Sequence, residues 1–150
     1  MNQFETEKVV MMLPPQLKDN GNFAGNTYID TMGYHGRLRV EFHVGTTDAA
    51  IGSTDEATPP KLEECETSGG SYTAITDAAL AAVIGAGDDN KIFAIDVDLR
   101  KTHKRYIEVT APHAADGTTG ANLCIVGRLS GPEKLPETAA EQGLEVLVSA

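Results

Sequence analysis

Aromatic side chains are scarce in this 150-residue sequence, which has no tryptophan, four tyrosines and four phenylalanines. Carbohydrate sites rely on exposed aromatic platforms, and nucleic-acid grooves rely on stacking aromatics combined with positive charge. The composition therefore disfavours both kinds of ligand.

Cysteines are equally rare. The two thiols, Cys65 and Cys124, lie too far apart in the sequence to form a metal-binding pattern or a disulfide framework. Cys124 belongs to an apolar run and is expected to be a small core residue. Cys65 lies among glutamates, which disfavour a reactive thiolate. A reducing compartment fits two free thiols, and a buried Cys65–Cys124 disulfide is an open alternative.

Basic residues and long apolar runs are also few. The sequence has 12 Lys and Arg against 22 Asp and Glu, a formal net charge of −10. Such a charge keeps a protein soluble and repels nucleic acid and anionic lipid. No run approaches the ~20 apolar residues of a membrane span, and the first residues lack the basic and apolar regions of a secretory signal. We therefore expect neither a nucleic-acid nor a membrane partner.

The charge is unevenly distributed along the chain. Residues 48–90 contain nine acids and one base, Lys61, whereas residues 100–105 contain four bases and no acid. This pattern is typical of a solvated surface. It also fits a two-signed surface that docks onto copies of itself or onto a large partner.

Alternating apolar and polar residues dominate the remaining pattern. In residues 37–44, Leu38, Val40, Phe42 and Val44 fall on one face of a predicted strand. Further short strands are predicted at residues 8–13, 26–31, 49–52, 62–66, 72–75, 91–99, 105–110, 121–129 and 144–148. Their spacing predicts an all-β, mainly antiparallel, jelly-roll-like β-sandwich. A parallel α/β fold would need helices between the strands.

At most one or two short helices are expected. The candidate is residues 76–85, where Thr76 is a capping residue, alanines favour helix and Gly85 ends the segment. A loop with one or two turns is the alternative. Pro14 and Pro15 end the first strand, because proline cannot donate to a ladder. We therefore divide the chain into an N-terminal arm or extended segment, residues 1–24, and a β-sandwich domain, residues 25–150.

Candidate catalytic and metal-binding residues do not form a known motif. The histidines are scattered and are interpreted as solvated or interface residues. Asp96 and Asp98 lie at i, i+2, a spacing that suits a hard cation or acid–base work. A cross-strand charge pair with the nearby bases is the simpler interpretation. We expect no enzymatic activity, metal, cofactor or small-molecule substrate. The four histidines are His35, His43, His103 and His113.

Seven short motifs occur in a recognisable order along the chain. They are Val9-Val10-Met11-Met12-Leu13-Pro14-Pro15-Gln16, Lys18-Asp19-Asn20, Tyr28-Ile29-Asp30-Thr31-Met32-Gly33-Tyr34, Val44-Gly45-Thr46-Thr47-Asp48-Ala49-Ala50, Leu62-Glu63-Glu64-Cys65-Glu66, Asp89-Asn90-Lys91-Ile92-Phe93-Ala94-Ile95-Asp96 and Lys104-Arg105-Tyr106-Ile107. Their order resembles that of small proteins encoded in the head-gene region of tailed bacteriophages. One difference is that Cys65-Glu66-Thr67 stand where such proteins usually have a Ser/Asp-rich turn, which leaves the contact role of that loop open.

This resemblance spans residues 8–148 and implies a capsid decoration, or cement, protein. It implies a β-sandwich made in the host cytoplasm that binds the major capsid protein on the outside of the virion. Homotrimers at three-fold positions are also implied. The alternative is a tail- or fibre-associated binding module that recognises a glycan or host surface, which would need the four tyrosines to converge.

Interface residues are expected in three places: the first strand, the clearest strand and the basic turn. The first strand is expected to add to the sheet edge of a neighbouring subunit. The basic turn is expected to meet an acidic rim of the capsid or of a neighbouring copy. The predicted interface residues are Val9, Val10, Met11, Met12, Leu13, Arg37, Arg39, Arg100, Lys101, Lys104 and Arg105.

Overall fold

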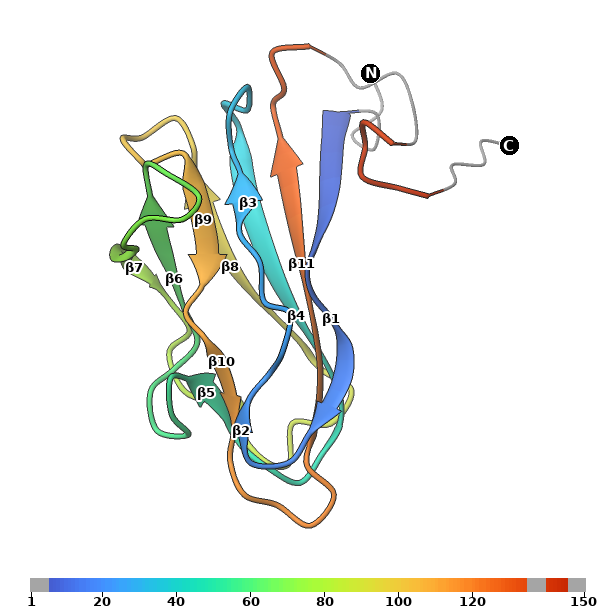
Figure 1. The fold of residues 1–150 in the computed structure, drawn as a ribbon. Coiled ribbons are helices and arrows are strands. Elements are labelled where there is room, and N and C mark those ends of the chain that lie inside the picture. The colour runs from blue at the N-terminus through green and yellow to red at the C-terminus, as the bar shows by residue number, and fades with distance from the viewer. Residues whose placement is uncertain (1–5, 135–139, 146–150) are drawn as a thin grey trace.

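Two layers of antiparallel strands make up the protein (Figure 1). The computed structural model describes residues 6–134 and 140–145. The first layer is a four-stranded sheet in the order β1–β11–β4–β8. Its strands are β1 (Glu7–Lys18), β4 (Arg37–Thr47), β8 (Ile92–Asp98) and β11 (Ala121–Ser130).

The second layer is built from two short sheets, β3–β9–β6–β7 and β2–β10–β5. The two sheets form one continuous layer. β9 pairs with β3 and β6, and β10, which directly follows β9, pairs with β2 and β5. The strands are β2 (Gly21–Asn22), β3 (Ile29–Asp30), β5 (Ile51–Ser53), β6 (Lys61–Cys65), β7 (Thr73–Ala79), β9 (Tyr106–Val109) and β10 (Pro112–Ala114).

The connection between the layers is that of a jelly roll. When each interrupted strand is counted once, the second layer has the order β2/β3, β9/β10, β5/β6, β7. The chain passes from one layer to the other at every step except at the β6–β7 hairpin. Eight antiparallel strands with two such four-stranded layers form a jelly roll. The prediction of a jelly-roll-like β-sandwich is confirmed.

The core lies between the layers, where the predicted alternation is observed. On β4, Leu38, Val40 and Phe42 have no exposed surface, whereas Arg37 and Arg39 on the opposite face are exposed. Because successive side chains of a strand point to opposite faces, one strand supplies both core and surface. Other fully buried core residues are Met12, Leu13, Ile29, Ile51, Leu62, Ile84, Ile107, Val109, Ile125 and Leu129.

The predicted helix at residues 76–85 is wrong. Residues 73–79 form β7, which pairs with β6, and Asp77 has a φ of 62°, which a right-handed helix does not allow. Helix propensity is a weak preference, and pairing with the sheet overrides it in a segment this short. No α-helix occurs in residues 6–134 and 140–145, and these residues contain no helix long and apolar enough to cross a membrane.

The N-terminal segment is extended, and it belongs to the sheet of its own chain. β1 pairs with β11 from Glu7 to Lys18, although the register shifts twice between Met11 and Gln16. Met12 and Leu13 are fully buried in the core. Parts of the predicted ranges 1–24 and 25–150 therefore share one sheet. Most of the predicted strand 144–148 lies outside the described residues.

A loop interrupts the second layer between β5 and β6. Residues 54–60 leave the ladder at Ser53 and return to it at Lys61, whose backbone N–H donates to Ser53 Oγ at 3.1 Å. The backbone N–H of Ser53 donates to the Thr58 carbonyl at 2.8 Å and closes the loop. Gly52 lies against this loop, where a Cβ would collide with backbone oxygens of Asp55 and Thr58.

We expect Gly52→Ala to lower the free energy of unfolding by about 1–3 kcal/mol, because the backbone oxygens have to shift to admit the methyl group. Gly69→Ala is the matched control, since no atom lies within 4 Å of its added Cβ. Urea denaturation measures both. Equal stabilities of the two variants would contradict the close approach at Gly52.

Candidate interaction surfaces

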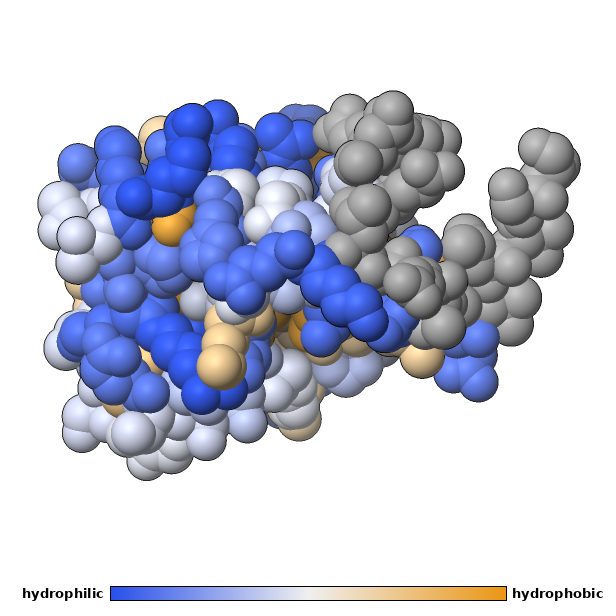
Figure 2. All heavy atoms as spheres, turned by 90° about the horizontal axis from the view of Figure 1, so that it is seen from above, coloured by the Kyte–Doolittle hydropathy of each residue, from blue (hydrophilic) through white to orange (hydrophobic). Residues whose placement is uncertain are grey.

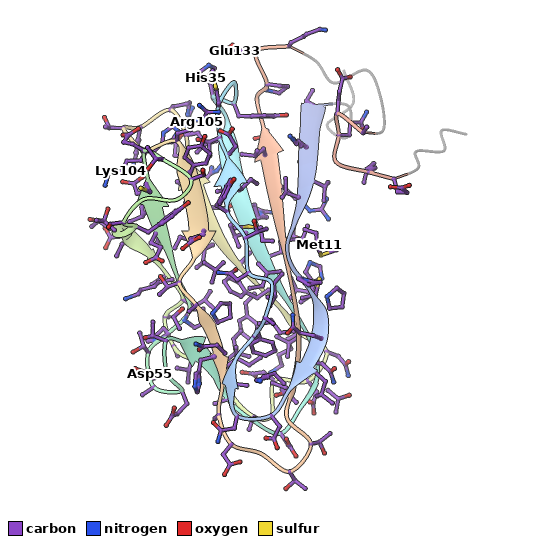
Figure 3. The ribbon with its side chains drawn as sticks, viewed as in Figure 1. Met11, His35, Asp55, Lys104, Arg105 and Glu133 are labelled. Atoms are coloured by element: carbon purple, nitrogen blue, oxygen red, sulfur yellow. The ribbon has the colours of Figure 1, made fainter. Side chains whose placement is uncertain are left out.

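The predicted interface residues of β1 split between the core and the surface. Met12 and Leu13 are fully buried, so they are unavailable to a partner. Val10 also points inward and packs against the core. Val9 and Met11 lie on the outer face of the first layer, where Met11 is 51% exposed and points away from the body (Figure 3).

β1 is not a free strand that a neighbouring subunit can take up. One of its edges pairs with β11. On the other edge, the Val9 N–H donates to the Gln142 carbonyl at 2.7 Å, and the Met12 carbonyl accepts from the Thr27 N–H at 2.9 Å. Pro14 and the two register shifts disrupt this edge further. The expectation that β1 adds to a neighbour's sheet is therefore corrected.

A shallow hollow on the outer face of the first layer gathers three arginines. Its volume is about 150 Å³, and its lining includes Arg37 and Arg39 of β4 and Arg128 of β11. Arg39 makes a two-pronged ion pair with Asp96 of β8, with Nε–Oδ1 at 3.0 Å and Nη2–Oδ2 at 3.1 Å. Arg37 forms no ion pair with the described residues.

These hydrogen bonds from Arg39 hold the pKa of Asp96 below its usual range. The prediction of a cross-strand charge pair at Asp96 is confirmed, because Arg39 and Asp96 lie directly opposite each other on β4 and β8. The base that pairs with Asp96 is Arg39 of β4. The sequence-based interpretation had considered the bases that follow Asp98.

An apolar patch borders this hollow. We call Val9, Met11, Cys124 and Val126 the Met11 patch, since they lie side by side on the outer faces of β1 and β11. The sulfur atoms of Met11 and Cys124 are 3.6 Å apart. The expectation that Cys124 is a core residue is wrong, because the inward positions of β11 are its neighbours in sequence. Cys124 is partly exposed, and both cysteines are free thiols.

Next to the patch, Arg128 donates to Glu41 at 3.1 Å, and His43 lies 3.0 Å from the same carboxylate. A Met-containing patch beside internally neutralised charges resembles a protein interface, where Met and Arg are enriched. The alternation of 121–129 aligns Leu123, Ile125, Gly127 and Leu129, which is the face that the structure buries. The outward position of Cys124 and Val126 follows from that alternation, but the apolar run in which they lie hid it.

The basic turn lies away from Met11, so the predicted interface residues do not form one surface (Figure 3). Arg100 binds Asp98 with two bonds of 2.8 Å, and these bonds hold the pKa of Asp98 well below its usual range. Arg105 binds Asp30 at 2.9 and 2.7 Å. Two of the four bases are therefore neutralised within the chain.

The side chains of the other two bases of the turn form no ion pair with residues 6–134 and 140–145, although the Lys104 backbone N–H donates to Glu64 Oε2 at 2.9 Å. Lys104 Nζ donates to Thr73 Oγ1 at 2.8 Å, and Lys101 forms no ion pair with the described residues.

The end of the sandwich seen in Figure 2 is mostly hydrophilic, with only small apolar spots.

A second hollow separates the edges of the two layers. It is a groove of about 510 Å³ between residues 74–78 of β7 and residues 96–98 of β8. Arg37, Lys101 and His103 also line it. The groove exposes one edge of β8, which is the last strand of its sheet.

The outer face of the second layer carries tyrosines and two facing carboxyl groups. Tyr28 and Tyr106 meet edge to face at 5.1 Å, and Arg105 covers the Tyr106 ring at 4.9 Å. Burial and the nearby Glu108 raise the pKa of Tyr72 to about 12. Arg105 occupies one face of the Tyr106 ring, and that face is therefore not open for a sugar to stack on.

Glu63 and Glu108 lie directly opposite each other on β6 and β9. Burial, followed by the hydrogen bond and charge of Glu63, raises the pKa of Glu108 to about 7. Two like charges at facing positions destabilise a sheet. The pair is therefore sensitive to pH. Within residues 6–134 and 140–145, no group of three or more His, Cys, Asp or Glu side chains is arranged to hold a metal ion.

No family model and no curated protein matches this chain. The crystal structure of SPBc2 prophage-derived protein YomS is similar to it with a TM-score of 0.47 and 14% sequence identity, over 82% of this chain and 91% of that chain.

We expect Glu108→Gln to stabilise the protein at pH 8 and to flatten its pH dependence. Glu108 binds its proton more tightly in the folded than in the unfolded chain, whose carboxyl titrates near 4.5. Its contribution to stability is thus present at low pH and is lost as pH rises through about 7. Denaturant unfolding at pH 5 and pH 8 measures this, with Glu56→Gln on an exposed loop as control. Parallel pH profiles for both variants would contradict the effect.

Proposed function

We propose that this chain is a decoration protein of a tailed-bacteriophage head that binds the major capsid protein on the outside of the assembled shell. The observation that carries the proposal is the outer face of the first layer. It places Arg37, Arg39 and Arg128 beside the Met11 patch on one sheet. Half-exposed apolar side chains within a rim of charged groups suit a protein partner.

The resemblance of the sequence to phage head proteins supplies the identity of that partner. Two of the predicted β1 residues, Val9 and Met11, share this face with the predicted residues Arg37 and Arg39. Arg37 has no ion-pair partner among the described residues and is free to meet an acidic group of the capsid. Truncation of apolar and Arg side chains at the centre of an interface typically has the largest effects.

The physics of decoration fits the fold and the charge. A protein that binds the assembled shell, and not its dissociated subunits, stabilises the shell by mass action. Trimers at three-fold positions, as the resemblance implies, would multiply weak contacts into a tight attachment. The net charge of −10 would keep decorated particles apart.

We expect Met11→Glu and Val126→Glu each to reduce binding to undecorated heads by about tenfold or more, since each places a charge in an apolar contact. Ala86→Glu, on an exposed loop, is the matched control. The measurement is co-sedimentation of purified protein with heads from a phage that lacks its gene. Failure of the wild-type chain to bind these heads, or equal binding by all variants, would refute the proposal.

A further inference from the structure

β8 has a free edge with unpaired backbone groups. The Val44 N–H donates to the Lys91 carbonyl at 2.9 Å, and the Leu99 N–H donates to the Gly36 carbonyl at 3.0 Å. Because alternate residues of a strand direct their backbone groups to opposite sides, those of Ile92, Ala94 and Asp96 point away from β4. No described residue pairs with this side of β8.

The other long edges of the sandwich are protected, whereas β8 is not. β1 has two register shifts and contacts with Gln142 and Thr27. β7 has a register shift and the left-handed residue Asp77. β8 contains neither proline nor a shift along its pairing with β4, and Ile92 is 63% exposed. A regular edge of this kind, without proline or a bulge, is a template for another strand.

The charges that flank β8 specify which strand fits. An acidic turn with Asp89 precedes the strand, and a basic turn with Lys101 follows it. If β8 pairs antiparallel with a copy of itself centred on Ile95, Ile92 lies opposite Asp98 of the second copy. The same register places Asp89 opposite Lys101 of the second copy, and two-fold symmetry repeats this pair at the other end.

Like-charge repulsion within the paired strands is small. β8 contributes two acids to its outer face, Asp96 and Asp98, and each has its own arginine. Arg39 binds Asp96, and Arg100 binds Asp98. Lys101 forms no ion pair with the described residues. Asp89 accepts the Thr47 N–H at 2.6 Å through Oδ1, but it is exposed and has no basic partner among these residues. The second copy would supply the missing ion-pair partner for both.

We propose that β8 is a self-association edge, at which two copies of this chain pair β8 to β8 into one continuous sheet across a two-fold axis. The contact does not depend on capsid binding. On an icosahedral shell it would link molecules at neighbouring three-fold positions, because a two-fold axis lies between such positions.

Ala94→Pro tests the backbone part of the proposal. Its N–H points to the free edge, so proline removes a bond to the second copy without removing one to β4. We expect the wild-type protein to self-associate with rising concentration in sedimentation velocity, and Ala94→Pro to weaken this at least tenfold while it retains the circular dichroism of the wild type. Amide hydrogen exchange of Ile92, Ala94 and Asp96 should slow on association. A wild-type monomer up to about 1 mM would overturn the proposal.

A charge swap keeps the test informative if the proline variant fails to fold. Asp89→Lys and Lys101→Glu should each weaken self-association at least about fivefold, because the two-fold axis doubles the loss of one exposed ion pair. Asp89→Lys also removes the hydrogen bond to the Thr47 N–H, so Lys101→Glu is the cleaner of the two single variants. The double variant should restore it. Lys61→Glu, in the second layer, is the control. Association that all these variants leave unchanged would overturn the pairing, whether or not the protein binds heads.

Discussion

β11 is the strand on which the rest of the structure depends. It hydrogen-bonds β1 on one side and β4 on the other, and so joins the first strand and the last strand of the described residues in one sheet. Its inward residues, such as Ile125 and Leu129, are fully buried in the core. Gly127 faces Ile29 and Met12 at the same depth, where a side chain would crowd the opposite layer. The alternate residues of the same strand create the outer surface.

That surface shows how an acidic protein presents arginines. The guanidinium groups of Arg39 and Arg128 each lie against a carboxylate of a neighbouring position, Asp96 or Glu41. Such exposed pairs contribute little to stability, typically below about 1 kcal/mol. They fix the directions of the side chains, which favours a defined contact over a diffuse attraction. The structure thus separates charge that is neutralised within the chain from charge that is available to a partner.

Much of the fold could be predicted from the sequence, because the period of two along β4 and β11 records burial on one face. The same period could not show which residues lie at an edge, since that depends on which strands neighbour each other in space. Val9 to Leu13 read as a separate arm because Pro14 follows them, yet β11 holds that segment in the sheet. The alanines of 76–85 favoured helix, and pairing with β6 prevailed.

The candidate surface was only half predictable for the same reason. Arg37 and Arg39 were found because they alternate with a clear apolar series. The sequence analysis did not select Arg128, Val126 and Ile92. Each is a common residue type for its position in a strand, and its place on the surface depends on which strands pair with its own. The basic residues 100–105 looked like a single patch in the sequence, but Asp98 and Asp30 neutralise half of it.

The loop at residues 54–60 has a practical consequence. Ser53 hydrogen-bonds both Thr58 and Lys61 and so closes the loop. The flanking strands β5 and β6 take their register from β10 and β9. The tip at Glu56 is exposed and holds no strand in place. Insertions beside Glu56 are therefore expected to leave the sandwich intact, so this tip is a position at which a foreign peptide can be displayed.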